Sequence, residues 1–194
     1  MYEIFLFVNP LGIACYRNEQ VLREFFADRG ARICVTFIPI VSPTTVADDM
    51  RRKGLPTCNF TAFRKSSENA YEALRLFHAI KQTAGNKKAR CFIYDLQKQV
   101  NSLCLPYSTK LAAEVADDLG LDFEKISAFS HDAALQESIN NDQDIADRYQ
   151  IQRTPTAVIF DEESSAAGVL IEGAFDKDSL QRALVNQISG IRLL

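Results

Sequence analysis

Segments with the character of buried strands lie only near the two ends of this chain, and a long helical block separates them. Residues 2–8 and 32–40 are rich in aliphatic, aromatic and β-branched side chains, as are residues 156–160 and 168–172. A helical pattern over residues 14–29 joins the first two strands. The predicted order is therefore β-α-β, then helices, then β-β-α, which is an α/β arrangement interrupted in the middle.

The first strand–helix–strand unit has the length of a parallel crossover. Its helix ends before Gly30, a typical C-terminal stop. We expect residues 41–59, which contain proline, glycine and several hydroxyl side chains, to form a loop. Residues 162–167 are expected to form a polar turn, and Asp176 is expected to cap a final helix. The apolar residues of that helix are Leu180, Ala183, Leu184 and Ile188.

The middle of the chain has the spacing of packed helices and no strand pattern. The apolar groups that mark these helices lie around residues 74–80, 89–100, 111–119, 123–129 and 135–149. We therefore predict a domain made of residues 1–60 and 151–194, with residues 61–150 as an all-helical insertion.

Composition excludes several classes of function. The chain has 194 residues, a formal net charge of −3 and 24% charged residues, so binding to nucleic acid is not expected. No apolar run approaches the ~18 residues of a membrane span, and the first residues lack the features of a signal peptide. We therefore expect a cytoplasmic protein without a membrane segment. The short basic cluster at residues 51–53 is interpreted as solvated surface.

Cysteine usage predicts free thiols and no metal site. The five cysteines are Cys15, Cys34, Cys58, Cys91 and Cys104, and no two of them form a C-x-x-C. Apart from Cys15, they are expected to be buried packing residues, with an oxidation sensor as the alternative. His78 and His131 have no second ligand nearby, so we interpret them as surface or hydrogen-bonded residues. Nothing in the sequence calls for a cofactor.

The first candidate site is the turn between the first strand and the first helix. It reads Asn-Pro-Leu-Gly-Ile-Ala-Cys over residues 9–15, with Gly12, Ile13, Ala14 and Cys15 at the start of the helix. A helix N-terminus carries partial positive charge and unpaired N–H groups, which stabilise a thiolate. Cys15 is therefore the candidate reactive residue, and a partly buried thiol that only packs is the alternative.

The second candidate site is the Thr154-Pro155 pair that precedes the strand at residues 156–160. A proline entering a buried strand directly after a helix is typical of a cis X-Pro bond. The placement of this pair between the helical block and the β-β-α end strengthens that interpretation.

These stretches carry a family resemblance. The chain resembles the DsbA-like branch of the thioredoxin superfamily, which implies a thioredoxin fold with an all-helical insertion. Within that branch it is similar to the SpxH (YjbH) group of cytoplasmic adaptors. The resemblance rests on residues 7–15, on Lys88-Ala-Arg-Cys-Phe-Ile-Tyr-Asp-Leu-Gln97 in the insertion, and on residues 149–160 with 169–173.

The resemblance implies two functions of different classes. DsbA-like oxidoreductases use a C-x-x-C turn in which the first cysteine attacks a disulfide. By position that cysteine falls on Gly12 and the second on Cys15, and a glycine cannot attack. This departure favours the adaptor group, whose members bind the stress regulator Spx and present it to the protease ClpXP.

The alternative is an enzyme. It would be a thiol-disulfide oxidoreductase or isomerase that uses Cys15 alone, or an enzyme like the glutathione transferases of the kappa class. Those transferases use a serine near the first-cysteine position, and residues 12–15 contain none.

The resemblance further implies that the segment before Pro155 can pair with an extended peptide.

Overall fold

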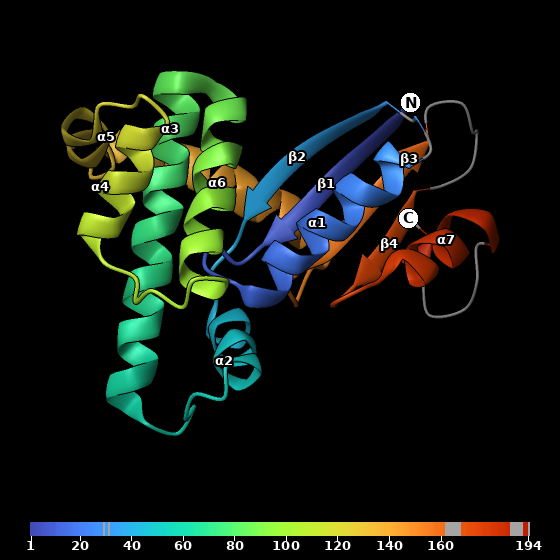
Figure 1. Ribbon diagram of the computed structural model, residues 1–194, viewed down its shortest axis with the longest axis horizontal. Helices are drawn as coiled ribbons and strands as arrows, with labels where there is room; N and C mark the ends of the chain where they lie inside the picture. Colours follow the sequence, from blue (N-terminus) through green and yellow to red (C-terminus); the bar gives the residue numbers. More distant parts are fainter. Residues whose placement is uncertain (29, 31, 162–167, 187–191, 194) are drawn as a thin grey trace.

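A computed structural model describes residues 1–28, 30, 32–161, 168–186 and 192–193, in which a mixed sheet stands beside a block of helices (Figure 1). The strand order in the sheet is β2-β1-β3-β4-β5. The strands are β1 (Tyr2–Val8), β2 (Ile33–Pro39), β3 (Thr156–Asp161), β4 (Val169–Glu172) and β5 (Arg192–Leu193). Segments from the two ends of the chain therefore lie side by side, as the strand pattern predicts.

The pairing of the strands follows from the connections between them. Helix α1 (Ile13–Ala27) leads from β1 to β2, and these two strands are parallel, with Tyr2 opposite Ile33 and Val8 opposite Pro39. β3 runs antiparallel to β1 on its other side, and β4 is antiparallel to β3. The parallel pairing confirms the predicted crossover, since a connection of a dozen or more residues, usually a helix, is needed to return the chain to a parallel neighbour.

The two faces of the sheet bury different residues. Alternate residues of β1, such as Ile4 and Leu6, pack with Leu22 of α1 and with Leu180 of α7 (Lys177–Asn186). Phe7 points to the opposite face, in a second cluster with the end of α6 (Ala133–Arg148). The near-continuous apolar character of β1 therefore reflects a central strand that is covered on both faces.

The helical insertion lies between β2 and β3. Its helices are α3 (Phe60–Asn101), α4 (Thr109–Asp118), α5 (Phe123–Phe129) and α6. α3 consists of two helices joined at Gly85, whose φ of 86° and ψ of 166° belong to a region open mainly to glycine. Ser108, Asp122 and Asp132 cap α4, α5 and α6 through their side-chain oxygens.

The loop predicted over residues 41–59 is wrong, because residues 43–52 form a helix, α2 (Pro43–Arg52). Ser42 and Thr45 make a capping box, and Pro43 occupies the first turn, where its missing N–H costs nothing. The proline and hydroxyl residues that suggested a loop are thus the start signal of a helix. Val46 and Met50 of α2 pack against the first half of α3.

At the C-terminal side, the Ser179 N–H donates to the Asp176 carboxylate over 2.7 Å, so the predicted cap is confirmed. The predicted turn at 162–167 and Ile188 lie outside the described residues. Within the described part of the chain, no helix has the length and apolar character needed to cross a membrane.

A buried polar cluster joins α3 to α6. His78 is fully buried, and its Nδ1 lies 2.9 Å from the Ser138 hydroxyl. The Asp142 carboxylate lies 3.6 Å from its Nε2 and pairs with Lys81 at 3.0 Å. Burial, aided by the positive charge of Lys81, lowers the pKa of His78 to about 3. The imidazole is therefore neutral, and Lys81 rather than His78 is the ionic partner of Asp142.

This cluster predicts a pH dependence of stability. The folded pKa of His78, about 3, lies below the unfolded value, about 6.5, so the unfolded chain binds a proton that the folded chain does not. The contribution is fully present above pH ~6.5 and is lost as the pH falls toward 3, by on the order of a few kcal/mol. Urea unfolding of the wild type and His78→Gln across this window measures it.

The matched control is His131→Gln, because His131 is exposed. This control should keep the wild-type pH dependence, whereas His78→Gln should remove the loss of stability that His78 contributes between pH ~6.5 and 3. Parallel curves for the wild type and His78→Gln would contradict the assignment.

Candidate functional site

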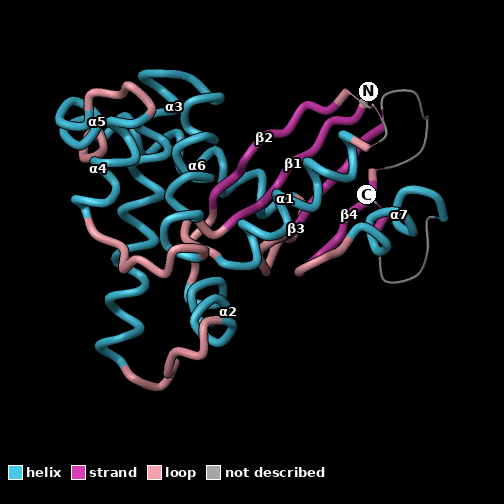
Figure 2. Tube along the Cα trace, in the orientation of Figure 1, coloured by secondary structure: helices cyan, strands magenta, loops and turns pink. Residues whose placement is uncertain are grey.

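The site lies where β1 and β2 end, and in Figure 2 loop segments gather there between α1, α2 and the insertion. Gly12 is the N-cap residue of α1, and Cys15 lies in the first turn. A Cβ added to Gly12 would stand 2.9 Å from the Cys15 Sγ. In a disulfide the corresponding separation is about 3.0 Å, given an S–S bond of about 2.04 Å. Positions 12 and 15 therefore face each other as the two positions of a redox pair do.

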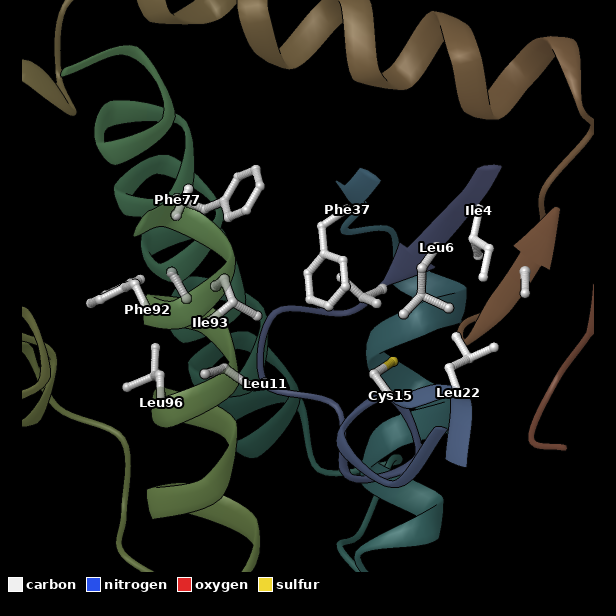
Figure 3. Close-up of a cluster of buried hydrophobic side chains, with 14 of the residues drawn as sticks. Ile4, Leu6, Leu11, Cys15, Leu22, Phe37, Phe77, Phe92, Ile93 and Leu96 are labelled. Atoms are coloured by element: carbon white, nitrogen blue, oxygen red, sulfur yellow. The ribbon is translucent and has the colours of Figure 1, made fainter. Parts of the chain in front are cut away.

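The thiol of Cys15 is enclosed. The residue is 1% exposed, and Figure 3 shows its side chain among Leu6 and Leu22. Burial raises the pKa of the Cys15 thiol to about 12, although the Asn9 N–H donates to its Sγ over 3.3 Å. The expected stabilisation of a thiolate by the helix N-terminus is thus outweighed by the removal of the sulfur from water.

A carboxylate from α2 occupies the N-terminus of α1. The Ile13 N–H donates to Asp49 Oδ1 over 2.9 Å. Asp49 Oδ2 lies 2.6 Å from the Lys53 ammonium group, which also donates to the Leu11 carbonyl over 2.7 Å. In a C-x-x-C turn, the dipole of this helix would stabilise the thiolate of the first cysteine. Here the Asp49 carboxylate, paired with Lys53, already lies at the helix N-terminus.

The loop before β3 is also engaged from α2. The Thr154–Pro155 peptide bond is cis. The Pro155 carbonyl accepts from the Gly173 N–H over 2.8 Å, which ties the loop to the end of β4. The Thr154 carbonyl accepts from Arg52 Nη1 over 2.7 Å. The backbone acceptor next to the proline is therefore satisfied within the chain.

Two side chains from the second half of α3 donate hydrogen bonds to the turn that begins at Asn9. Gln97 Nε2 donates to the Asn9 carbonyl over 3.0 Å, and Asn101 Nδ2 donates to the Leu11 carbonyl over 3.3 Å. Gln97 is fully buried, so this hydrogen bond is shielded from competing water. The turn at residues 9–13 is thus held by side chains from both α2 and α3.

The interpretation of the basic cluster at residues 51–53 as solvated surface is incomplete, although Arg51 and Arg52 are exposed and Lys53 is half-buried. Arg51 pairs with Asp48 at the surface, but Arg52 and Lys53 bind the two candidate loops. These residues and Asp49 were missed because their segment was assigned to a loop. The i,i+4 spacing of Asp49 and Lys53, once placed on a helix, is the signal that could have found them.

The expectation that the remaining cysteines are buried is also wrong. Cys34, Cys58 and Cys104 are exposed, and Cys91 is partly buried. Cys34 stands on β2, which pairs with β1 on one side only, while Cys58 and Cys104 lie outside helices and strands. Among the described residues no group of three or more His, Cys, Asp or Glu side chains could hold a metal ion.

Comparison with known proteins places these features in context. Residues 5–182 match the family model described as Thioredoxin. The chain is 20% identical over 188 residues to the ClpXP adapter protein SpxH of Staphylococcus haemolyticus, and likewise to SpxH of Staphylococcus aureus. The match covers 97% of this chain but only 65% and 66% of those proteins.

Solved structures share the fold. BdbD of Bacillus subtilis superposes with a TM-score of 0.66 at 12% identity, over 93% of this chain and 84% of that one. DsbA2 of Pseudomonas aeruginosa gives a TM-score of 0.62 at 19% identity, over 94% of this chain and 86% of that one. The predicted DsbA-like fold with a helical insertion is confirmed, and at these identities the likeness concerns the fold alone.

The separation between positions 12 and 15 predicts that Gly12→Cys creates a disulfide with Cys15. The introduced sulfur can reach bonding distance with only a small shift of the turn. Peptide mapping after mild oxidation should detect the 12–15 cross-link, together with the loss of two hydrogen atoms in the intact mass. Gly12→Ser is the control and should show no cross-link. Free thiols at both positions of the cysteine variant after oxidation would refute the geometry.

The Asp49 contacts predict that Asp49→Ala destabilises the fold by about 1–3 kcal/mol, because a partly buried N–H and an ammonium group lose their acceptor. Hydrogen exchange of the Ile13 amide should accelerate as well. Asp48→Ala, which removes only the surface pair with Arg51, should change stability by less than about 0.5 kcal/mol. Equal effects of the two substitutions would show that the Ile13 contact contributes nothing.

Proposed function

Because the chain belongs to the thioredoxin family, we propose that it acts within that family as an adaptor, which binds a client of the Spx type in the cytoplasm and promotes its degradation by ClpXP. The observation that carries this proposal is the pair of residues at positions 12 and 15. Gly12 has no side chain, and Cys15 has a buried thiol.

The chemistry of thiol-disulfide exchange supports this choice. Exchange requires a thiolate that can reach a disulfide from solvent. Because burial raises the pKa of the Cys15 thiol to about 12, the thiol is protonated at pH 7, and its sulfur is covered. Position 12, where the attacking sulfur of a C-x-x-C turn would stand, is glycine.

The curated relatives support the adaptor class. The match to SpxH proteins runs along nearly the whole chain, and those relatives are named as ClpXP adapters. They are about half as long again as this chain, so the identity of the client and the delivery to the protease remain part of the proposal.

One observation favours a second candidate, a thiol-disulfide oxidoreductase or isomerase. Cys15 receives a hydrogen bond from the Asn9 N–H, and the Thr154 side chain also acts to lower its pKa. A glutathione-transferase-like activity has less support, because the turn contains no serine.

A reconstituted degradation reaction separates the two candidates. Purified ClpXP is mixed with an Spx-type regulator, and the half-life of the regulator is measured with and without this chain. The adaptor role predicts faster degradation that Cys15→Ser leaves unchanged within about twofold, because a thiol with a pKa of about 12 takes no part as a thiolate. No acceleration, together with a Cys15-dependent rate of disulfide exchange, would favour the enzyme instead.

A further inference from the structure

A groove lies between α2, the first half of α3 and the segment that follows α3. Its volume is about 670 Å³, within the range of ligand-binding clefts. Val46 and Met50 of α2 and Ala70 of α3, which are buried in one cluster, line it from the inside. Leu11 and Ile13 of the redox turn also line it, so the groove adjoins the candidate site but opens beside it.

The rim of the groove exposes large apolar side chains. Leu55 is 46% exposed and Leu105 is 42% exposed, and both line the groove. Leu103, which is 57% exposed, lies two residues before Leu105. Three of the six large apolar side chains that are exposed in the described part of the chain thus belong to this region, which is the pattern of an interaction surface.

The charged residues that line the groove are Asp49, Arg52 and Lys53. The ion pair between Asp49 and Lys53 leaves Arg52 as the uncompensated charge, although the chain as a whole has a net charge of −3. Arg52 uses Nη1 for the Thr154 carbonyl, and a guanidinium group has further N–H donors. A partner that carries a carboxylate therefore complements this groove.

The hydrogen bond from Arg52 to the Thr154 carbonyl bears on the conformation of the partner segment. Because Arg52 already donates to the Thr154 carbonyl, an extended peptide that pairs there has to share this acceptor with Arg52 or displace its side chain. The groove, in contrast, lies between α2, α3 and the segment that follows α3, and apolar side chains make up most of its lining. Such a groove receives the apolar face of an amphipathic helix.

We propose that the α2–α3 groove is the client-docking site, and that it binds an amphipathic helix whose apolar side chains contact Leu55 and Leu105 and whose acidic side chain pairs with Arg52. This inference rests on the proposed function for the existence of a client. The location of the site and the chemistry of the docked segment are new.

Two matched pairs of variants test the proposal, with a purified Spx-type regulator as the binding partner of the full chain. Leu105→Asp should weaken binding by about tenfold or more, whereas Phe60→Asp should change it by less than about twofold. Phe60 is the control because it is 77% exposed and lies outside the lining of the groove. Circular dichroism of both variants checks that the fold is intact.

The second pair of variants tests the contribution of the Arg52 charge to binding. Arg52→Gln should weaken binding and reduce its dependence on salt, and Arg51→Gln should do neither, because Arg51 pairs with Asp48 and does not line the groove. Alkylation gives an independent readout. Bound regulator should protect Cys104, which lines the groove, and leave Cys34 on β2 reactive.

The outcomes are distinguishable. Wild-type binding that survives both Leu105→Asp and Arg52→Gln would overturn the docking site and leave the adaptor role standing. The absence of wild-type binding and of stimulated degradation would overturn both. Self-association that Leu105→Asp abolishes, without an effect on the regulator, would assign the groove to a second copy of this chain.

Discussion

The contact between the Asp49 carboxylate and the Ile13 N–H is the one on which the rest of the site depends. It places the last turn of α2 against the start of α1, and that turn also supplies Lys53 to the Leu11 carbonyl and Arg52 to the Thr154 carbonyl. The helix N-terminus, the turn before it and the cis-proline loop are thus each contacted by a side chain from this turn of α2.

The two redox positions lie directly beside this contact. The sulfur of Cys15 is enclosed, and position 12 is a glycine. Helix α2, which contacts the start of α1 through Asp49, also lines the groove next to this turn. The residues that close the reactive centre therefore help to build the surface on which we propose that a client docks.

The helical insertion contributes side chains to the candidate site. Gln97 and Asn101 at the end of α3 hold the turn at residues 9–12, so the insertion and the sheet share one site. The buried cluster of His78, Lys81 and Asp142 joins α3 to α6, and α6 in turn covers a face of the sheet. The two halves of α3, joined at Gly85, therefore make different contacts: the first with α6 and the second with the turn.

The sequence by itself determined the order of β1 to β4 and of the helices other than α2, the parallel crossover and the cap at Asp176. Each of these depends on local spacing, where the apolar period and the turn residues act within a few positions of each other. It did not determine α2, because the proline and hydroxyl residues of a capping box also occur in loops. Only the tertiary structure decided the burial of Cys15, the exposure of Cys34, Cys58 and Cys104, and the roles of Asp49, Arg52 and Lys53. Those properties depend on which distant segments pack together, and the free energy of a charge or a thiol is set by that surrounding medium.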